Sequence, residues 1–409
     1  MTDAGTEAAR RLDLLSRCSE PGPGVTRLPF TPEHRAALDL LTLWMRDAGL
    51  AVTLDDAGTL VGRLDGPPGA PTLYLGSHQD SVREGGAFDG IAGVVLPLVA
   101  LERLRAQGAT LPFAVELLAF ADEEGVRFPT ALLGSRALAG TAEAAALDLA
   151  DRDGITVDAA LRGFGLDPHR IPLLARPRAS ALGFVEVHIE QGPVLERAGE
   201  ALGIVTAISG IERHAITIGG ETGHAGTLPM EGRRDALVGA AELVLAVRRI
   251  AAGGDGLRGT VGALEVHPNV VNAVPDRVRL TAEFRAPGDT AREAAGAELH
   301  RIAAEVAELH GLRIEARRTY AQPARPCDPR LSDALSAAVT AGGGQGLRLP
   351  SGATHDASAM ADLCPMAMLF VRCRGGVSHR PEEHAAPGDL GAAIAALETF
   401  LLRLDPASG

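Results

Sequence analysis

Five short polar segments of this 409-residue sequence carry side chains that bind metal ions or transfer protons. Each segment follows an apolar run or lies in a loop, and together they supply three imidazoles and several carboxylates. The side chains are those of His78, Asp80, Asp89, Glu123, Glu124, His188, Glu190, Gln191 and His379. Taken singly, such a histidine is more often a satisfied core or surface residue, and an acidic pair is usually a solvated turn. Their joint occurrence favours one functional site.

The mixture of imidazole and carboxylate indicates a divalent metal site, because these groups suit Zn, Mn, Co and Ni. The four cysteines are scattered and form no CxxC pair, so the sequence offers no thiolate cluster. One carboxylate can bridge two ions, and two ions roughly 3.5–4 Å apart stabilise a hydrolytic transition state. Neighbouring side chains on extended backbone face opposite ways. Glu123 and Glu124 can therefore divide metal binding and proton transfer between them.

The stretch GSHQDSVREGGAFDG at residues 76–90 contains the first two of these segments and is rich in glycine. Glycines at 85, 86 and 90 allow the backbone to turn sharply. We therefore expect this loop to bring Asp89 back beside His78.

The apolar runs before these segments alternate with helical patterns, as in an α/β fold with a buried, largely parallel sheet. Ligand-binding residues of such sheets lie beyond the carboxyl ends of the strands, where the polar segments occur. The expected strands are 72–78, the first part of 113–125, 183–192 and 366–371. The expected helices are 32–48, 91–108, 331–341 and 389–403, with helical embellishments at 141–180.

A different pattern begins near residue 210 and ends at the proline-rich stretch YAQPARPCDP. Its expected elements are strands 214–218, 259–267, 276–285 and 312–320 and helices 233–252 and 290–311. This is the β-α-β-β-α-β order of a ferredoxin-like unit. We therefore expect an inserted lid and dimerisation domain, 210–326, within a catalytic metal-binding domain made of 1–209 and 327–409.

Composition argues against several classes of partner. Aromatic residues make up only 3% of the chain and the net charge is −13, which disfavours nucleic acid. No segment approaches the ~18 consecutive apolar residues of a membrane span, and the N-terminus lacks the apolar core of a signal peptide. The expectation is a cytoplasmic protein without a nucleic-acid or membrane partner.

Several motifs, in consistent order from about residue 30 to 400, closely resemble the hydantoinase/carbamoylase branch of the M20 metallopeptidase-like amidohydrolases. They are GSHQDSVREGGAFDG, FADEEGVRF with GSRALAG, EVHIEQGPVLE, GHAGTLPMEGRRDAL, NVVNAVPDRVRLTAEFR, SGATHDA and GGVSHRPEEH. HIEQGP is the most discriminating, because peptidase branches usually carry an aspartate where this chain has His188. The branch includes N-carbamoyl-L-amino acid hydrolases, allantoate amidohydrolases and β-ureidopropionases.

The resemblance implies two divalent ions (Zn, Mn, Co or Ni) and a role for each polar residue. The metal ligands would be His78 and His188 for one ion, Glu124 and His379 for the other, and Asp89 as the bridge. Glu123 would be the general base. Asp80 would accept a hydrogen bond from His78 and fix its tautomer.

The inserted domain would supply most of the substrate contacts in this resemblance. His224, Asn272 and Arg285 would hold the substrate's carboxylate and polarise its carbonyl, with Gln191 contributing from the catalytic domain. A guanidinium suits a bidentate carboxylate contact. His224 would come from the partner subunit of a homodimer. His355 is a further candidate for substrate contact.

The expected reaction is hydrolysis of an N-carbamoyl-L-amino acid to the amino acid, ammonia and CO2. Alternatives are allantoate, N-carbamoyl-β-alanine, another N-acyl amino acid or amide conjugate, and a non-catalytic binding protein with this fold. Thr354, Leu228 and Arg380 depart from the residues common in the family and lie close to expected substrate contacts. These departures leave the identity of the substrate open. The expected metal ligands and the base are all present.

Overall fold

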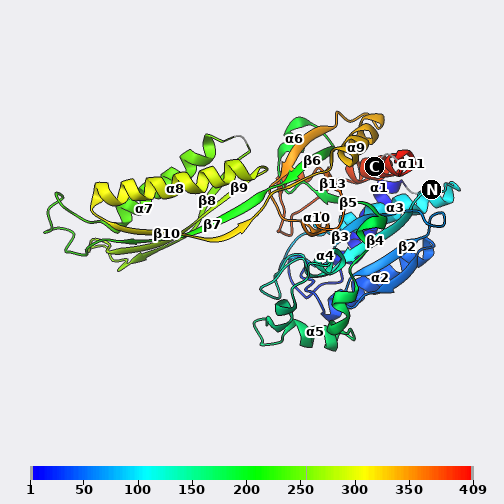
Figure 1. The fold of residues 1–409 in the computed structure, drawn as a ribbon, viewed down its shortest axis with the longest axis horizontal. Helices are drawn as coiled ribbons and strands as arrows, with labels where there is room; N and C mark the ends of the chain where they lie inside the picture. The colour runs from blue at the N-terminus through cyan, green and yellow to red at the C-terminus, as the bar shows by residue number, and fades with distance from the viewer. Residues whose placement is uncertain (1–2, 255, 407–409) are drawn as a thin grey trace. The chain divides into compact units, whose positions relative to one another are not determined.

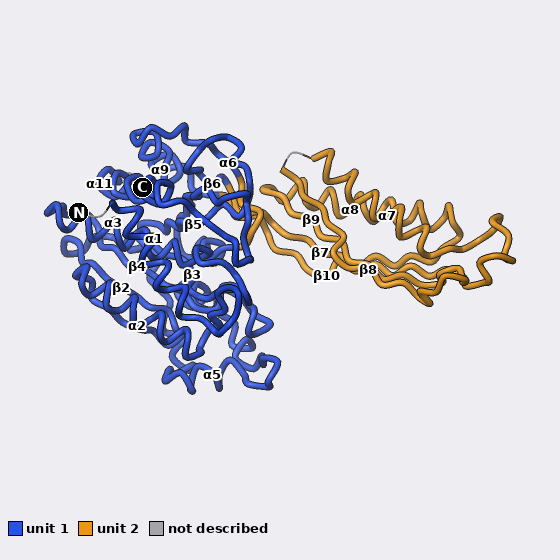
Figure 2. Tube along the Cα trace, turned by 180° about the vertical axis from the view of Figure 1, so that it is seen from behind, with its two compact units in different colours: residues 1–206, 327–349, 355–409 blue, residues 207–326, 350–354 orange. Residues whose placement is uncertain are grey.

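The computed structural model describes residues 3–254 and 256–406, which form two compact units (Figure 2). The first unit runs to Thr206 and continues over Cys327–Leu349 and from His355 onward. The second comprises Ala207–Pro326 and Pro350–Thr354. The second unit is therefore larger than the expected insertion, because 207–209 and the short segment 350–354 belong to it.

Most of a nine-stranded mixed sheet lies in the first unit (Figure 1). Its strand order is β1-β2-β4-β3-β5-β13-β6-β11, and β12 pairs with β6. The strands are β1 (Ala51–Leu54), β2 (Leu60–Leu64), β3 (Thr72–His78), β4 (Ala114–Phe120), β5 (Ala181–Ile189), β6 (Leu202–Ile208), β11 (Arg325–Pro326), β12 (Leu347–Ser351) and β13 (Met366–Val371). The four central strands β4, β3, β5 and β13 are parallel, whereas β1, β2, β6 and β11 pair antiparallel.

Burial explains why the central strands are apolar from end to end. Every residue of β3, β4 and β13 is buried, because helices and loops cover both faces of a parallel sheet. Helix α11 contacts α1, α3 and α9 in the layer on one face (Figure 1). The α-helices of this unit are α1 (Ala4–Ser16), α2 (Pro32–Asp47), α3 (Ala92–Ala106), α4 (Leu133–Ala139), α5 (Val157–Gly163), α6 (Val194–Ala198), α9 (Pro329–Ala341), α10 (Asp356–Met360) and α11 (Pro387–Arg403).

The parallel pairing brings distant segments to one edge of the sheet. His78 at the end of β3 is paired in register with Phe120 at the end of β4. His188 near the end of β5 is paired with Phe370 of β13. The polar segments that follow these strands therefore start from neighbouring positions.

The second unit is a four-stranded antiparallel sheet with two long helices. Its elements follow the expected β-α-β-β-α-β order, and the sheet order is β10-β7-β9-β8. They are β7 (Gly210–Gly219), α7 (Ala236–Ala252), β8 (Arg258–His267), β9 (Arg277–Ala286), α8 (Asp289–His310) and β10 (Arg313–Gln322). Apolar residues of both helices and the sheet form a core separate from that of the first unit.

The α/β class expected from the sequence is confirmed, but several elements were not anticipated. The sequence interpretation omitted α1, the β1–β2 pair and β6, which extend the core and the antiparallel edges of the sheet. The stretch 141–180 contains one short helix, α5, and otherwise 3-10 turns. Within the described residues, no helix combines the length and apolar character needed to cross a bilayer.

Candidate metal centre

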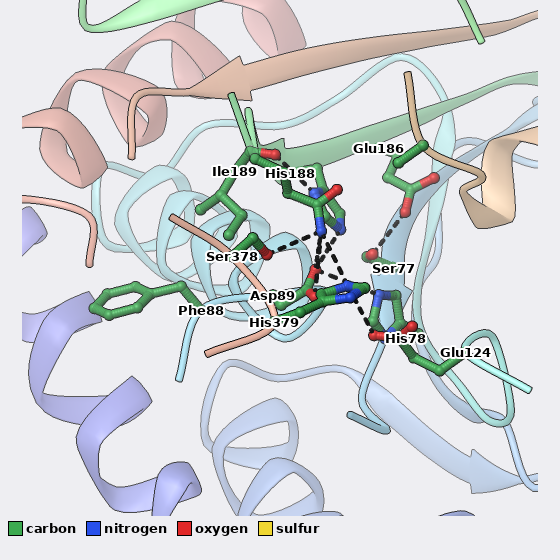
Figure 3. A network of polar contacts seen from close by, with 12 residues as sticks. Ser77, His78, Phe88, Asp89, Glu124, Glu186, His188, Ile189, Ser378 and His379 are labelled. Atoms are coloured by element: carbon green, nitrogen blue, oxygen red, sulfur yellow. Dashed lines mark hydrogen bonds and ion pairs between the residues drawn. The ribbon is translucent and has the colours of Figure 1, made fainter. Parts of the chain in front are cut away.

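Asp89 lies at the centre of a cluster of imidazoles and carboxylates (Figure 3). Its Oδ1 is 3.1 Å from Nε2 of His188 and 4.0 Å from Nε2 of His78. Its Oδ2 is 3.1 Å from Nε2 of His379, and this same nitrogen lies 3.7 Å from Oε1 of Glu124. Each oxygen of one carboxylate therefore faces a different set of donor atoms.

These donors form two groups with Asp89 in common. His78, Asp89 and His188 each offer one atom, and the three atoms lie within 4.8 Å of one another. Asp89, Glu124 and His379 form a second such group. All five residues come from the separate segments that the sequence indicated, so the structure brings the expected ligands together.

Backbone hydrogen bonds orient the two histidines on the strands. Nδ1 of His78 lies 2.9 Å from the carbonyl oxygen of Asp80, and Nδ1 of His188 lies 2.8 Å from that of Ile189. A carbonyl only accepts, so each ring donates from Nδ1 and turns Nε2 toward Asp89. Both rings thus present the nitrogen that a metal ion needs.

The hydrogen bond expected from His78 to the Asp80 side chain is wrong, since Oδ1 of Asp80 lies 3.9 Å from Nδ1 of His78. We expected the Asp80 carboxylate to accept the hydrogen bond from His78, but the backbone carbonyl of Asp80 does so. The carboxylate instead accepts hydrogen bonds from the backbone N–H groups of Glu123 and Glu124, each at 3.2 Å. Asp80 therefore fixes the turn that carries the acidic pair.

Buried atoms without a hydrogen-bond partner show that the cluster fits a cation. Oε1 of Glu124 is buried and makes no hydrogen bond, and the buried Nε2 of His188 has no partner other than the Asp89 carboxylate, 3.1 Å away. Leaving such atoms unsatisfied is costly, whereas a divalent ion would be coordinated by them. Imidazole and carboxylate donors match the preference of Zn, Mn, Co or Ni.

The electrostatics of the cluster reflect its crowding. Although burial opposes it, His188 and His379 hold the pKa of Asp89 well below its usual range. In return, Asp89 raises the pKa of His379 to about 9, and it raises that of His188 to about 9 against the effect of burial. Burial and the charge of Asp89 raise the pKa of Glu124 to about 7. The cluster thus favours positive charge, which protons or a bound metal ion would supply.

Glu123 occupies a position suited to proton transfer. Its carboxylate joins His78 and Glu124 in a third group of donor atoms within 4.8 Å of one another. Burial, followed by the charges of Glu124 and Asp356, raises the pKa of Glu123 well above its ordinary value. A carboxylate with a raised pKa is a stronger base.

The substrate-binding residues expected in the first unit lie among the ligands. Nε2 of Gln191 is 3.2 and 3.3 Å from the two oxygens of Asp89, and it donates to the hydroxyl of Ser378 at 3.0 Å. His355 is only 1% exposed, and its ring packs edge-on against His188 with centroids 4.5 Å apart. Both residues therefore support the arrangement of the ligands.

The substrate-binding residues expected in the second unit are held by contacts of their own. A β-bridge joins His224 to Ala273, which places His224 beside Asn272. Arg285 on β9 donates to Glu283 at 2.7 Å and to the carbonyl oxygen of Gly352 at 2.7 Å. Their contact with a substrate stays a prediction.

Sequence reasoning missed three residues behind the ligands. Glu186 accepts hydrogen bonds from the hydroxyl of Ser77 at 2.6 Å and from the backbone N–H of Ala357 at 2.8 Å (Figure 3 shows the first contact). Glu383 and Ser378 connect the loops that carry Asp89 and His379. Strand periodicity could have identified Glu186, because it lies two residues before His188 and so on the same face of β5.

Comparison with known proteins places the chain in a family. The family model for peptidase family M20/M25/M40 matches residues 74–403. An N-carbamoyl-L-amino acid amidohydrolase of Geobacillus stearothermophilus is 39% identical over 93% of each chain. An allantoate deiminase of Arabidopsis thaliana is 37% identical over 97% of this chain and 81% of its own length. A crystal structure of a hydantoinase/carbamoylase family amidase from Burkholderia multivorans superposes with a TM-score of 0.91, at 33% identity over 97% of each chain.

The chain belongs to peptidase family M20/M25/M40. Its relatives place it in the hydantoinase/carbamoylase branch, and like them it is an amidohydrolase, a hydrolase of amide C–N bonds.

A substitution at Gly90 tests how closely the loop between β3 and α3 must approach His78. A Cβ at this glycine would lie 2.3–2.4 Å from the ring of His78, and its φ is +66°. Gly90→Ala should therefore lower metal affinity by roughly 10–100-fold, the usual effect of disturbing a ligand's support. Equilibrium dialysis against Zn or Mn would measure this.

Gly108→Ala is the matched control for that variant. Gly108 has a similar φ of +71° but open space around its Cβ position, so the variant should lose stability through backbone strain alone. Equal metal affinity in the two alanine variants would contradict the close-packing explanation.

Proposed function

We propose that the chain is a dinuclear metal-dependent hydrolase of N-carbamoyl-L-amino acids. The observation that carries the proposal is the position of Asp89, whose two oxygens face two separate groups of donors. A carboxylate placed in this way would suit a bridge between two metal ions. His78 and His188 would complete one metal site, and Glu124 and His379 the other.

The chain's own residues would divide the chemistry as follows. Divalent ions would polarise the carbonyl and lower the pKa of water, as in other metallohydrolases. Glu123, within reach of His78 and Glu124, would take the proton of the attacking water and return it to the departing nitrogen. Asp80 would keep Glu123 in place through its hydrogen bond to the backbone.

The substrate proposal rests on the relatives and on the expected carboxylate contacts. The Geobacillus stearothermophilus relative is an N-carbamoyl-L-amino acid amidohydrolase, similar over 93% of this chain. Arg285, with Asn272 and His224, would bind the substrate's carboxylate. An allantoate substrate is the second candidate, favoured by the similarity to the Arabidopsis thaliana allantoate deiminase.

Metal stoichiometry tests the shared carboxylate. The protein should bind two divalent ions per chain, His379→Ala should retain one, and Asp89→Ala should lose tight binding of both because both sites share this residue. Elemental analysis after dialysis would count the ions. Replacement of the exposed His169 by alanine is the control and should leave two ions; one ion in the unmodified protein would contradict a dinuclear centre.

The acidic pair offers a sharp test of the catalytic assignment. Glu123→Gln should retain both ions and lower kcat by roughly 10²–10⁴-fold through loss of proton transfer, whereas Glu124→Gln should lose metal. Ammonia release from N-carbamoyl-L-methionine, allantoate and N-carbamoyl-β-alanine would be measured with Zn, Mn, Co and Ni. Full activity of Glu123→Gln would refute the role of Glu123 as general base. Ammonia release from allantoate alone would mean that allantoate, and not an N-carbamoyl-L-amino acid, is the substrate.

We also propose a homodimer formed through the second unit. Strand β8 is at the edge of its sheet and carries Leu264, 44% exposed, while α7 exposes Leu245 at 54%. Unpaired strand edges with apolar side chains favour association. Sedimentation should give twice the chain mass of 42.3 kDa, and Leu264→Glu should shift it toward the monomer; a monomer at micromolar concentration would contradict the proposal.

A further inference from the structure

Glu383 is a buried carboxylate that joins two loops of the candidate metal centre without being one of its ligands. It is only 4% exposed. Its Oε1 accepts the backbone N–H groups of Phe88 at 2.9 Å and Asp89 at 3.0 Å. Its Oε2 accepts the hydroxyl of Ser378 at 2.8 Å. One side chain thus connects the β3–α3 loop to the loop before α11.

The packing around Glu383 leaves it little freedom. A Cβ at Gly86 would lie 2.1 Å from Oε1 of Glu383, so the backbone of the β3–α3 loop runs directly against the carboxylate. Next to it, the ring of Phe88 meets that of His384 edge-on, with centroids 5.7 Å apart. The two loops are therefore joined by a polar and an apolar contact side by side.

The groups that Glu383 holds are adjacent to ligands in the chain. The backbone N–H of Asp89 donates to Glu383, and the Asp89 carboxylate is the one shared by two donor groups of the cluster. Ser378 precedes His379, whose φ of +57° is unusual for a residue other than glycine. The hydroxyl of Ser378 also accepts a hydrogen bond from Gln191 at 3.0 Å. Loss of Glu383 would release the backbone on both sides of the group formed by Asp89, Glu124 and His379.

We propose that Glu383 is a positioning residue that sets the distance between Asp89 and His379 and thereby the affinity of the metal site containing Glu124. This inference rests on the dinuclear centre proposed above. The site of His78 and His188 depends less on Glu383, because these ligands are fixed on strands by backbone carbonyls. Supporting residues of this kind affect metal affinity by about 10–100-fold.

The adjacent Glu382 offers a matched control. Its side chain is 65% exposed and lies 3.6 Å from Arg380 at the surface. Replacing it removes the same charge from the same loop without removing a hydrogen bond to Asp89 or Ser378.

The experiment is a Co²⁺ titration of the metal-free protein and its variants, followed by visible absorption and calorimetry. The unmodified protein should bind two ions. Glu383→Ala should bind the first ion with little change and the second about 10–100-fold more weakly, with an altered Co²⁺ spectrum for the second ion. Glu382→Ala should match the unmodified protein.

Two further variants distinguish geometry from general destabilisation. Glu383→Gln keeps an oxygen for the N–H groups of Phe88 and Asp89, so it should recover most of the second-ion affinity. Ser378→Ala removes the contact to Oε2 and the hydrogen bond from Gln191 but keeps both N–H contacts to Oε1, so it should weaken the second ion by a smaller factor. Both remain informative if Glu383→Ala does not fold.

The outcomes separate this inference from the proposal on which it rests. If the unmodified protein binds a single ion, the dinuclear centre itself is wrong. If it binds two ions and Glu383→Ala binds both as tightly, Glu383 has no positioning role. Equal weakening of both ions, or a loss that Glu383→Gln does not reverse, would also overturn the inference.

Discussion

The carboxylate of Asp89 must face three imidazoles at once, and the surrounding structure follows from that requirement. Two rings approach one oxygen and the third approaches the other, at distances of 3.1–4.0 Å. The charges stabilise one another, since the histidines hold the pKa of Asp89 down while it raises those of His188 and His379. Such an arrangement is stable only if the backbone of every segment is fixed, because small displacements separate the donors.

The sheet and the buried carboxylates fix these segments in different ways. The parallel strands supply rigid starting points for His78 and His188. The loops beyond the strands are held by acidic side chains that accept backbone N–H groups: Asp80 holds the turn of the acidic pair, Glu186 holds Ala357, and Glu383 holds Asp89. Charged acceptors form stronger hydrogen bonds than neutral ones. Much of the acidity near the site is therefore structural.

The sequence allowed the α/β class and the clustering of the five expected ligands to be predicted because both have local signals. Apolar runs that end in a histidine or an acidic pair mark strand ends, and the family motifs name the ligands. The roles of Asp80 and Glu383 could not be read in this way. Whether a carboxylate meets an imidazole or a backbone N–H depends on how loops fold after the strands end, and residues far apart in the chain decide it. Helix α1 and strand β6 were missed because neither carries a motif.

The chain returns to the second unit for five residues, Pro350–Thr354, immediately before His355. The N–H of Ser209 donates to the carbonyl oxygen of Ser351, and Arg285 donates to that of Gly352. The second unit is therefore not made of one continuous segment of the chain. Excising 207–326 would leave these two carbonyls without their hydrogen-bond donors, just before His355, which packs on His188. An exchange of the second unit between relatives would therefore have to include 350–354 as well as 207–326.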